Sequence, residues 1–295
     1  MNREENLKVV LMWRRVSASA GIFATVIGAV VLIGWLFDIE TLKGILPIWV
    51  TMKANTAVGI LLSGLAVVLI SLETVPAKTG LRQARKVLSA TVFFIGLATL
   101  FEYVFDVNLG IDQLLFHEPE GTIGTLSPGR MAPTSALGFL FVGLALTLDC
   151  ISLQSQRLYT VLAILVAVLS LTSLVGYLYN VKYLYGIGRA TQMAAHTAVA
   201  FFFLAIGMFT LRPDQGFPAV LRKKDSGGVT ARHLLPIVIV MPLVIGYIKL
   251  LGDRLTVVEP AFGVGDGCDC LHCRSLPVDI LALFQAFSGR GRTSA

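Results

Sequence analysis

Charged residues are scarce in this chain of 295 amino acids. They make up 14% of it, against about a quarter in an ordinary soluble domain. Hydrophobic residues make up 55%, and the mean hydropathy is +0.78. Low charge with high hydrophobicity excludes a disordered chain and a protein that coats nucleic acid. Cysteine is also rare: there are four, three of them crowded near the C-terminus, which excludes a disulfide framework. The composition indicates that most of the chain lies in lipid.

Catalytic signatures are missing as well. The sequence contains no phosphate-binding loop, nucleophile elbow, kinase phosphoacceptor context or pair of catalytic carboxylates. Gly186-Ile187-Gly188 does not stand between a strand and a helix, as a nucleotide-binding fingerprint would. We therefore expect no enzymatic activity and no cofactor for this chain.

Apolar stretches are what the sequence has in abundance. Seven are close to the length of about 20 residues that a helix needs to cross a bilayer. Because they lack alternation, helices are favoured over strands. The sequence thus predicts an all-α, polytopic membrane bundle over residues 16–251, between a basic N-terminus (1–15) and a divergent, disordered tail (252–295). The predicted spans are Val16–Phe37, Ala54–Leu72, Val87–Phe105, Pro133–Leu148, Leu158–Tyr179, Met193–Leu211 and Leu234–Leu251.

The connections between these stretches differ in their content of Lys and Arg. Fourteen lie in the N-terminus and the second, fourth and sixth connections, and five lie in the alternate connections. Positively charged loops stay on the cytoplasmic side of a membrane. We therefore expect a multi-pass protein of the bacterial inner membrane with a cytoplasmic N-terminus. The net charge of +6 records this topology and does not indicate a polyanionic partner.

Three predicted helices, those beginning at or just after Met52, Met131 and Met193, repeat one pattern. The fifth, seventh, twelfth and fourteenth residues after each Met are Gly or Ala. Such seams let helix backbones approach closely in lipid, so these helices should be sandwiched within the bundle. The seam positions are Ala57, Gly59, Gly64 and Ala66; Ala136, Gly138, Gly143 and Ala145; Ala198, Ala200, Ala205 and Gly207.

The preceding helices repeat more loosely, since each ends in aromatic residues followed by Asp or Asn. These ends are Asp38, Asp106 and Asn180. The sequence therefore predicts three copies of a helix-pair unit, and the seventh span begins a fourth unit that stays unpaired.

The motifs Met131–Ala136, Gly143–Leu146 and Tyr185–Ala198, with Arg212–Asp214 and Leu234–Pro236, resemble the N-terminal multi-pass membrane domain of bacterial signalling proteins. In that family the domain precedes PAS, histidine-kinase or diguanylate-cyclase modules. The resemblance, over roughly residues 15–264, implies a sensory or anchoring role upstream of a cytoplasmic output.

The chain departs from that family after Glu259–Val264, where an eighth helix would follow. We expect a truncated or frameshifted sensor, and a natural short form remains the alternative. The tail carries Cys268, Cys270, His272 and Cys273, whose spacing makes them weak candidates for a metal site. An unstructured tail is the favoured interpretation.

Polar residues near the predicted outer boundary are the candidates for sensing. The favoured interpretation is that they cap helices and that Trp35, Tyr103 and Tyr177 are interfacial anchors. The alternative is an outer pocket for a small or lipophilic signal, with Glu102 and His196 as its titratable members. The candidates are Asp38, Asn55, Glu102, Asp106, Thr134, Asn180 and His196.

The expected partners are membrane lipids, an unidentified signal and, as an open alternative, a second copy of the chain. A small transporter or channel is the alternative function. It would need polar residues in mid-helix, and those positions are almost wholly apolar.

Overall fold

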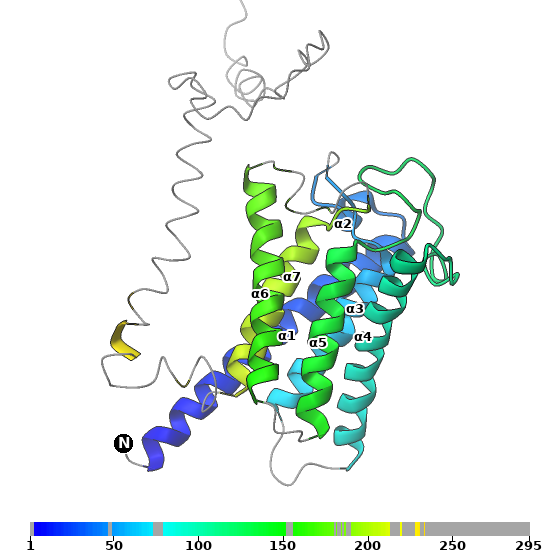
Figure 1. The fold of residues 1–295 in the computed structure, drawn as a ribbon. Helices are drawn as coiled ribbons and strands as arrows, with labels where there is room; N and C mark the ends of the chain where they lie inside the picture. Colours follow the sequence, from blue (N-terminus) through cyan, green and yellow to red (C-terminus); the bar gives the residue numbers. More distant parts are fainter. Residues whose placement is uncertain are drawn as a thin grey trace, which may run out of the picture. The chain divides into compact units, whose positions relative to one another are not determined.

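The computed structural model describes residues 3–46, 49–72, 79–151, 156–179 and 190–212, with a few isolated positions from 181 to 233. Asn180, the span Leu234–Leu251, and Cys268, Cys270, His272 and Cys273 of the tail lie outside the described residues. The chain divides into two units, Met1–Ile248 and Lys249–Ala295, and all described elements belong to the first. In the part that the structure describes, these elements are helices, as predicted (Figure 1). They are α1 (Arg3–Leu36), α2 (Glu40–Lys43), α3 (Ala54–Ser71), α4 (Thr79–Phe105), α5 (Pro133–Ile151), α6 (Gln156–Tyr179) and α7 (Ala195–Leu211).

Five of these helices, α1, α3, α4, α5 and α6, are long and apolar enough to cross a membrane. They coincide with the first five predicted spans. Helix α7 occupies the position of the sixth predicted span and is shorter, with 17 residues. The chain thus has the build of a membrane protein.

Two helices extend beyond their predicted spans. Helix α1 begins at Arg3, before the predicted Val16, and α4 begins at Thr79, before Val87. A hydropathy window detects the part of a helix that suits lipid. Lys, Arg, Gln and Glu are good helix formers, so each helix continues through its polar end. The short helix α2 was not predicted.

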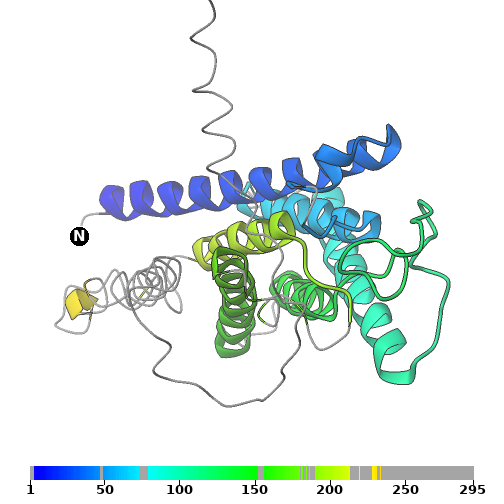
Figure 2. The same ribbon diagram turned by 90° about the horizontal axis from the view of Figure 1, so that it is seen from above.

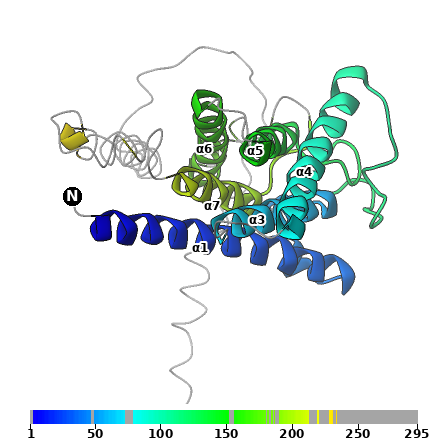
Figure 3. The same ribbon diagram turned by 90° about the horizontal axis from the view of Figure 1, so that it is seen from below.

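The long helices form an inner and an outer group. Helices α3, α5 and α7 contact one another, and each outer helix contacts two of them: α1 packs on α3 and α7, α4 on α3 and α5, and α6 on α5 and α7. Figures 2 and 3, viewed along the bundle, show α3 and α7 between α1 and the pair α5 and α6. The apolar windows of α3 and α5 are each 61% buried, against 28–33% for α1, α4 and α6. The small-residue seams predict this difference.

Glycine lets neighbouring backbones touch at two equivalent contacts. A Cβ atom at Gly28 of α1 would lie 2.7 Å from the carbonyl oxygen of Ala57 in α3. A Cβ atom at Gly96 of α4 would lie 2.6 Å from the carbonyl oxygen of Ala136 in α5. Real Cβ atoms do not approach an oxygen so closely, so neither contact accommodates a side chain.

The middle of the inner group is filled by aromatic rings seated on glycines. The ring of Phe139 in α5 lies against Gly59 of α3, and the ring of Phe201 in α7 lies against Gly138 of α5. The two ring centroids are 5.0 Å apart. Phe139 and Phe201 are 0% and 1% exposed, so the inner helices enclose a packed core.

Replacing Gly143 with Ala tests this close packing. The added Cβ would overlap the backbone nitrogen of Phe93 in α4, so the α4–α5 contact must open. We expect G143A to lower the free energy of unfolding by about 1–3 kcal/mol, as overpacking does. G80A is the control, because no atom beyond the adjoining backbone of its own helix lies within 4 Å of a Cβ at Gly80. It should be neutral or stabilising by up to about 1 kcal/mol. Equal thermal unfolding midpoints of G143A and G80A in detergent would contradict the packing argument.

Candidate functional site

The candidate site lies at the end of the bundle where α1, α4 and α6 finish and α3, α5 and α7 begin, which we call the loop end. Here an aromatic side chain near the end of each outer helix donates a hydrogen bond to the carbonyl oxygen of the methionine just before the next inner helix. The pairs are Trp35 and Met52 (2.9 Å), Tyr103 and Met131 (3.0 Å), and Tyr177 and Met193 (2.6 Å). The residues predicted as interfacial anchors thus also tie each outer helix to the inner helix that follows.

The aspartates at the helix ends have a backbone role. Asp38 and Asp106 have φ angles of 55° and 50°, in the left-handed region that usually takes Gly or Asn at a helix C-terminus. The next amide then bonds back to the last turn: Ile39 to the carbonyl of Gly34 (2.8 Å), and Val107 to that of Glu102 (3.3 Å). Both aspartates thus help to end their helices through backbone geometry.

The polar residues predicted to cap α3 and α7 do not occupy the N-capping positions of these helices. The capping positions are held by Lys53 and Ala194, neither of which makes a side-chain capping bond. Both helices begin one residue before the polar pair, so Asn55 and His196 lie inside the first turn. The Asn55 side-chain oxygen instead accepts the adjacent amide of Thr56 at 2.7 Å.

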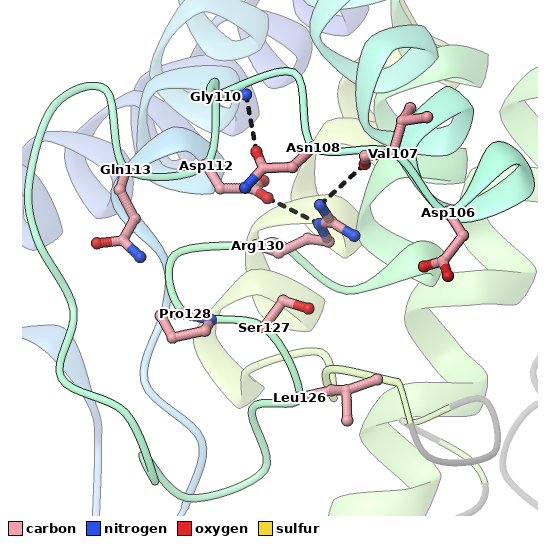
Figure 4. Close-up of a pocket in the computed structure, with 10 residues that line it drawn as sticks. All are labelled: Asp106, Val107, Asn108, Gly110, Asp112, Gln113, Leu126, Ser127, Pro128 and Arg130. Carbon is pink, nitrogen blue, oxygen red and sulfur yellow. Dashed lines mark hydrogen bonds and ion pairs between the residues drawn. The ribbon is translucent and has the colours of Figure 1, made fainter.

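A buried ion cluster joins the end of α4 to the start of α5 (Figure 4). The Arg130 Nε atom lies 2.7 Å from Asp112 Oδ2, as Figure 4 shows. The same atom lies 3.7 Å from Glu102 Oε2. The Arg130 guanidinium also donates to the carbonyl of Val107 at 3.2 Å, and Glu102 Oε1 accepts the amide of Leu109 at 2.8 Å. Burial alone would lower the pKa of Arg130, but Asp112 and Glu102 outweigh it and raise that pKa, so the group is held as a cation.

Part of this cluster faces an open, polar pocket of about 410 Å³. Figure 4 shows Arg130, Asp112, Asn108 and Asp106 around it, with Ser127 on the part of the loop that returns towards α5. Because the Arg130 guanidinium is already bonded to Asp112, the pocket presents a paired positive and negative charge to a ligand, together with other hydrogen-bonding groups. A small polar molecule could compete for these bonds.

A second buried ion pair anchors the same loop to α3. Lys53 Nζ pairs with Glu118, and both side chains are 2% exposed. Lys53 also donates to Thr125 Oγ1 at 2.6 Å, and Glu118 Oε2 accepts the amide of Gly129 at 2.6 Å. Burial lowers the pKa of Lys53 below its ordinary value, and the charge of Glu118 offsets this only in part. The loop between α4 and α5 is thus held by charge on both sides.

A third cation, Lys43, closes the connection between α1 and α3. It pairs with Asp38 and lies 2.9 Å from Glu40, and its ammonium sits 4.8 Å from the centre of the Trp35 ring. Burial opposes the charged form, but the two carboxylates outweigh it and raise the pKa of Lys43. Asp38, predicted as a sensing residue, is engaged in this pair.

The remaining predicted residues do not converge on one pocket. His196 is 9% exposed and lines a cavity of about 220 Å³ together with residues of α1, such as Ile27, and of the segment after α2. Glu102 belongs to the ion cluster with Arg130, and Thr134 is 8% exposed. Among the described residues, no three His, Cys, Asp or Glu side chains form a group that could hold a metal ion.

Sequence reasoning missed four members of the buried ion pairs: Lys53, Asp112, Glu118 and Arg130. A signal for two of them exists in the sequence, because Lys53 and Arg130 flank the motif methionines Met52 and Met131 in a chain with few charges. A cation beside an apolar helix start needs a partner. The carboxylates could not be assigned, since the loop also contains Glu120, which is exposed.

No protein-family model matches the chain, and neither a curated protein nor a solved structure matches it.

The buried pair of Lys53 and Glu118 gives a stability prediction. K53M leaves a buried carboxylate without its cation and should cost roughly 3–5 kcal/mol of unfolding free energy. The matched control is K43M, whose partners Asp38 and Glu40 are 89% and 74% exposed. The Lys43 side chain is itself 7% exposed, but K43M leaves two carboxylates that stay hydrated, so it should cost only about 1 kcal/mol. The double variant K53M/E118Q should recover part of the loss, because Gln still accepts the amide of Gly129. Equal unfolding midpoints for K53M and K43M in detergent would show that the buried pair contributes nothing.

Proposed function

We propose that the chain is the membrane sensory or anchoring domain of a bacterial signal-transduction protein, with the N-terminus in the cytoplasm and the loop end outside. The observation that carries this proposal is the ion cluster of Glu102, Arg130 and Asp112. Arg130 and Asp112 line a polar pocket, Glu102 belongs to the last turn of α4, and Arg130 stands three residues before α5. A molecule that competes for Arg130 would act on both helices at once.

The α4–α5 contact can carry such a change along the bundle. Gly96 and Gly143 bring the two backbones together without intervening side chains, so movement of one helix must shift the other. At the opposite end, Arg212, just after α7, donates to Asp149 of α5 at 2.5 Å. A ligand shifts such a system only as far as its affinities for two packings differ.

The bundle that we propose consists of seven spans, with three helix pairs, α1–α3, α4–α5 and α6–α7, as copies of one unit. The support is the hydrogen bond that recurs in all three pairs from an aromatic side chain to a methionine carbonyl. Glycine contacts recur at matching positions of the first two pairs, Gly28 on Ala57 and Gly96 on Ala136.

A transporter or channel is the weaker proposal. Transport needs a polar site or path near the middle of the bilayer. Phe139, Phe201 and Ile60 are each at most 1% exposed and occupy the middle of the inner group. Packed apolar side chains at this level favour signalling over passage of a polar solute.

Reporter fusions test the proposed orientation. Alkaline phosphatase is active only outside the cytoplasm, so a fusion after Glu120 should be active and one after Ala77 inactive. Green fluorescent protein at the same two sites should give the reverse pattern. The opposite result at both sites would invert the bundle and place the loop end in the cytoplasm.

A kinase chimera tests the sensory role. A histidine-kinase core joined after residue 232 should autophosphorylate in membranes, and R130Q should change that level by about two- to thirtyfold, as substitutions along a coupled network do. E120Q, which removes an exposed charge from the same loop, is the control and should leave the level unchanged. Autophosphorylation that ignores R130Q, together with solute flux through proteoliposomes of the full chain, would favour a transporter.

A further inference from the structure

A second, apolar cavity lies beside the ion cluster. It has a volume of about 440 Å³, within the range of about 300–1,000 Å³ that ligand sites occupy. Its walls come from four segments: the start of α3, the outer half of α4, residues 111–115 of the loop, and Met131 before α5. Eight of its eleven lining residues are apolar and none is charged. We call this cavity the α3–α4 groove.

The groove is long and opens towards the surface of the bundle. Its lining runs along α4 from Thr91 to Thr99, a distance of about 12 Å at 1.5 Å per residue. Phe94 and Leu115, which line it, are 61% and 53% exposed. In the proposed bundle this exposed face of α4 would meet lipid. A molecule could therefore enter from the bilayer.

Two polar atoms at the loop end of the groove lack a hydrogen-bond partner within the described part of the chain. They are Asn55 Nδ2 and Thr99 Oγ1. Thr99 is 0% exposed, so bulk water does not satisfy its hydroxyl. A buried polar group without a partner costs free energy, which a ligand that supplies the partner would recover.

Thr99 does not follow the pattern of several other hydroxyls in these helices. Thr25, Ser63 and Ser89 each donate to the carbonyl four residues earlier in their own helix, at 2.6–2.8 Å. This is the usual way for a membrane helix to satisfy a hydroxyl. The Thr99 hydroxyl makes no such bond in the described structure. Because Thr99 is 0% exposed, a molecule in the groove would reach this hydroxyl once neighbouring side chains shift.

We propose that the α3–α4 groove binds a neutral, membrane-dissolved molecule that has an apolar body and a carbonyl group at its polar end. The amide nitrogen of Asn55 can only donate, and its side-chain oxygen already accepts the Thr56 amide, so the ligand must present an acceptor. The Thr99 hydroxyl can donate to the same carbonyl or to a second one. The apolar body would lie along α4 towards Thr91.

Charge in the surroundings argues for a neutral head. Glu102 lies three residues beyond Thr99 on α4, and its Oε2 atom has no hydrogen bond in the described residues. Glu102 and Asp112 share the single cation Arg130, so the cluster beside the groove carries a net negative charge. That charge would repel an anionic head such as a fatty-acid carboxylate in a low-dielectric site. A cationic head would meet the donor group of Asn55. A ketone or quinone carbonyl satisfies both constraints.

The groove adjoins the ion cluster to which the proposed function assigns sensing. Binding of a ligand in the groove does not depend on that function, and only the effect of binding on signalling rests on it. Ile111 lines the groove, and its neighbour Asp112 holds Arg130. Met131, which also lines it, has its carbonyl held by Tyr103. A ligand that displaces residues 111–115 would therefore move the ion cluster that joins α4 to α5.

Photolabelling of the full chain in phospholipid nanodiscs tests the proposal. The probe is a long-chain alkyl methyl ketone carrying a diazirine on its chain, used at low mole fraction with phospholipid in large excess. We expect saturable labelling of peptides from α3 and α4, competed by the unlabelled ketone and not by the matching alkane. T99V keeps the side-chain shape and removes the hydroxyl, so it should weaken the apparent affinity by about three- to tenfold. V58F, which fills the groove, should abolish saturable labelling.

The control variant is T147V in α5, which also removes an unpartnered hydroxyl of the described structure but lies outside the groove. It should label like the wild type, and circular dichroism should show that all three variants remain folded. Labelling that does not saturate, or that the alkane competes equally, would show that ordinary lipid chains occupy the groove and would overturn the proposal. Equal affinities of T99V and wild type would overturn the role of the carbonyl. Neither result would touch the sensory role, which the kinase chimera tests independently.

Discussion

Direct contact between helix backbones is the constraint on which this bundle depends. Lipid offers no hydrophobic force to drive one helix against another, so packing and hydrogen bonding must do so. Gly28, Gly96 and Gly143 allow α1 to reach α3 and α4 to reach α5 at distances that exclude a Cβ atom. Phe139 and Phe201, seated on glycines of neighbouring inner helices, then fill the space between α3, α5 and α7. Without the glycines, the outer helices would stand off, and the aromatic-to-methionine hydrogen bonds at the loop end would be out of reach.

The buried charges at the loop end follow from the same geometry. Lys53 and Arg130 stand directly beside apolar helix starts, where an unpaired cation is costly. The loop between α4 and α5 therefore returns twice to the bundle, with Glu118 on Lys53 and Asp112 on Arg130. A loop fixed in this way is a structural part of the bundle. Perturbing either pair would change where α5 begins relative to α3 and α4.

Much of the fold could be predicted from hydropathy and from small-residue spacing. The first five spans coincide with helices of sufficient length, and the seams around Gly59 and Gly138 correctly indicated which helices are buried. The sequence could not show that α1 and α4 continue into polar residues, because helix propensity and hydropathy measure different properties. The site was less predictable. Whether Glu118 or the exposed Glu120 faces Lys53 depends on how the loop folds back, which no local pattern encodes.

Two cavities of different chemistry share one stretch of loop. The polar pocket takes Asp112 and Gln113 from it, and the apolar groove takes Ile111, Leu114 and Leu115. The segment 111–115 therefore lies between a compartment open to polar solutes and one that meets lipid. A displacement caused from either side would act on the same Asp112–Arg130 bond, since Asp112 and Ile111 are adjacent in the chain. Binding of a polar molecule in the pocket and binding of a lipophilic molecule in the groove would then be coupled through this segment. Each ligand would change the affinity of the protein for the other. Paired charges next to an apolar groove are costly to bury together, and the sensory role that we propose would give that arrangement a physical reason.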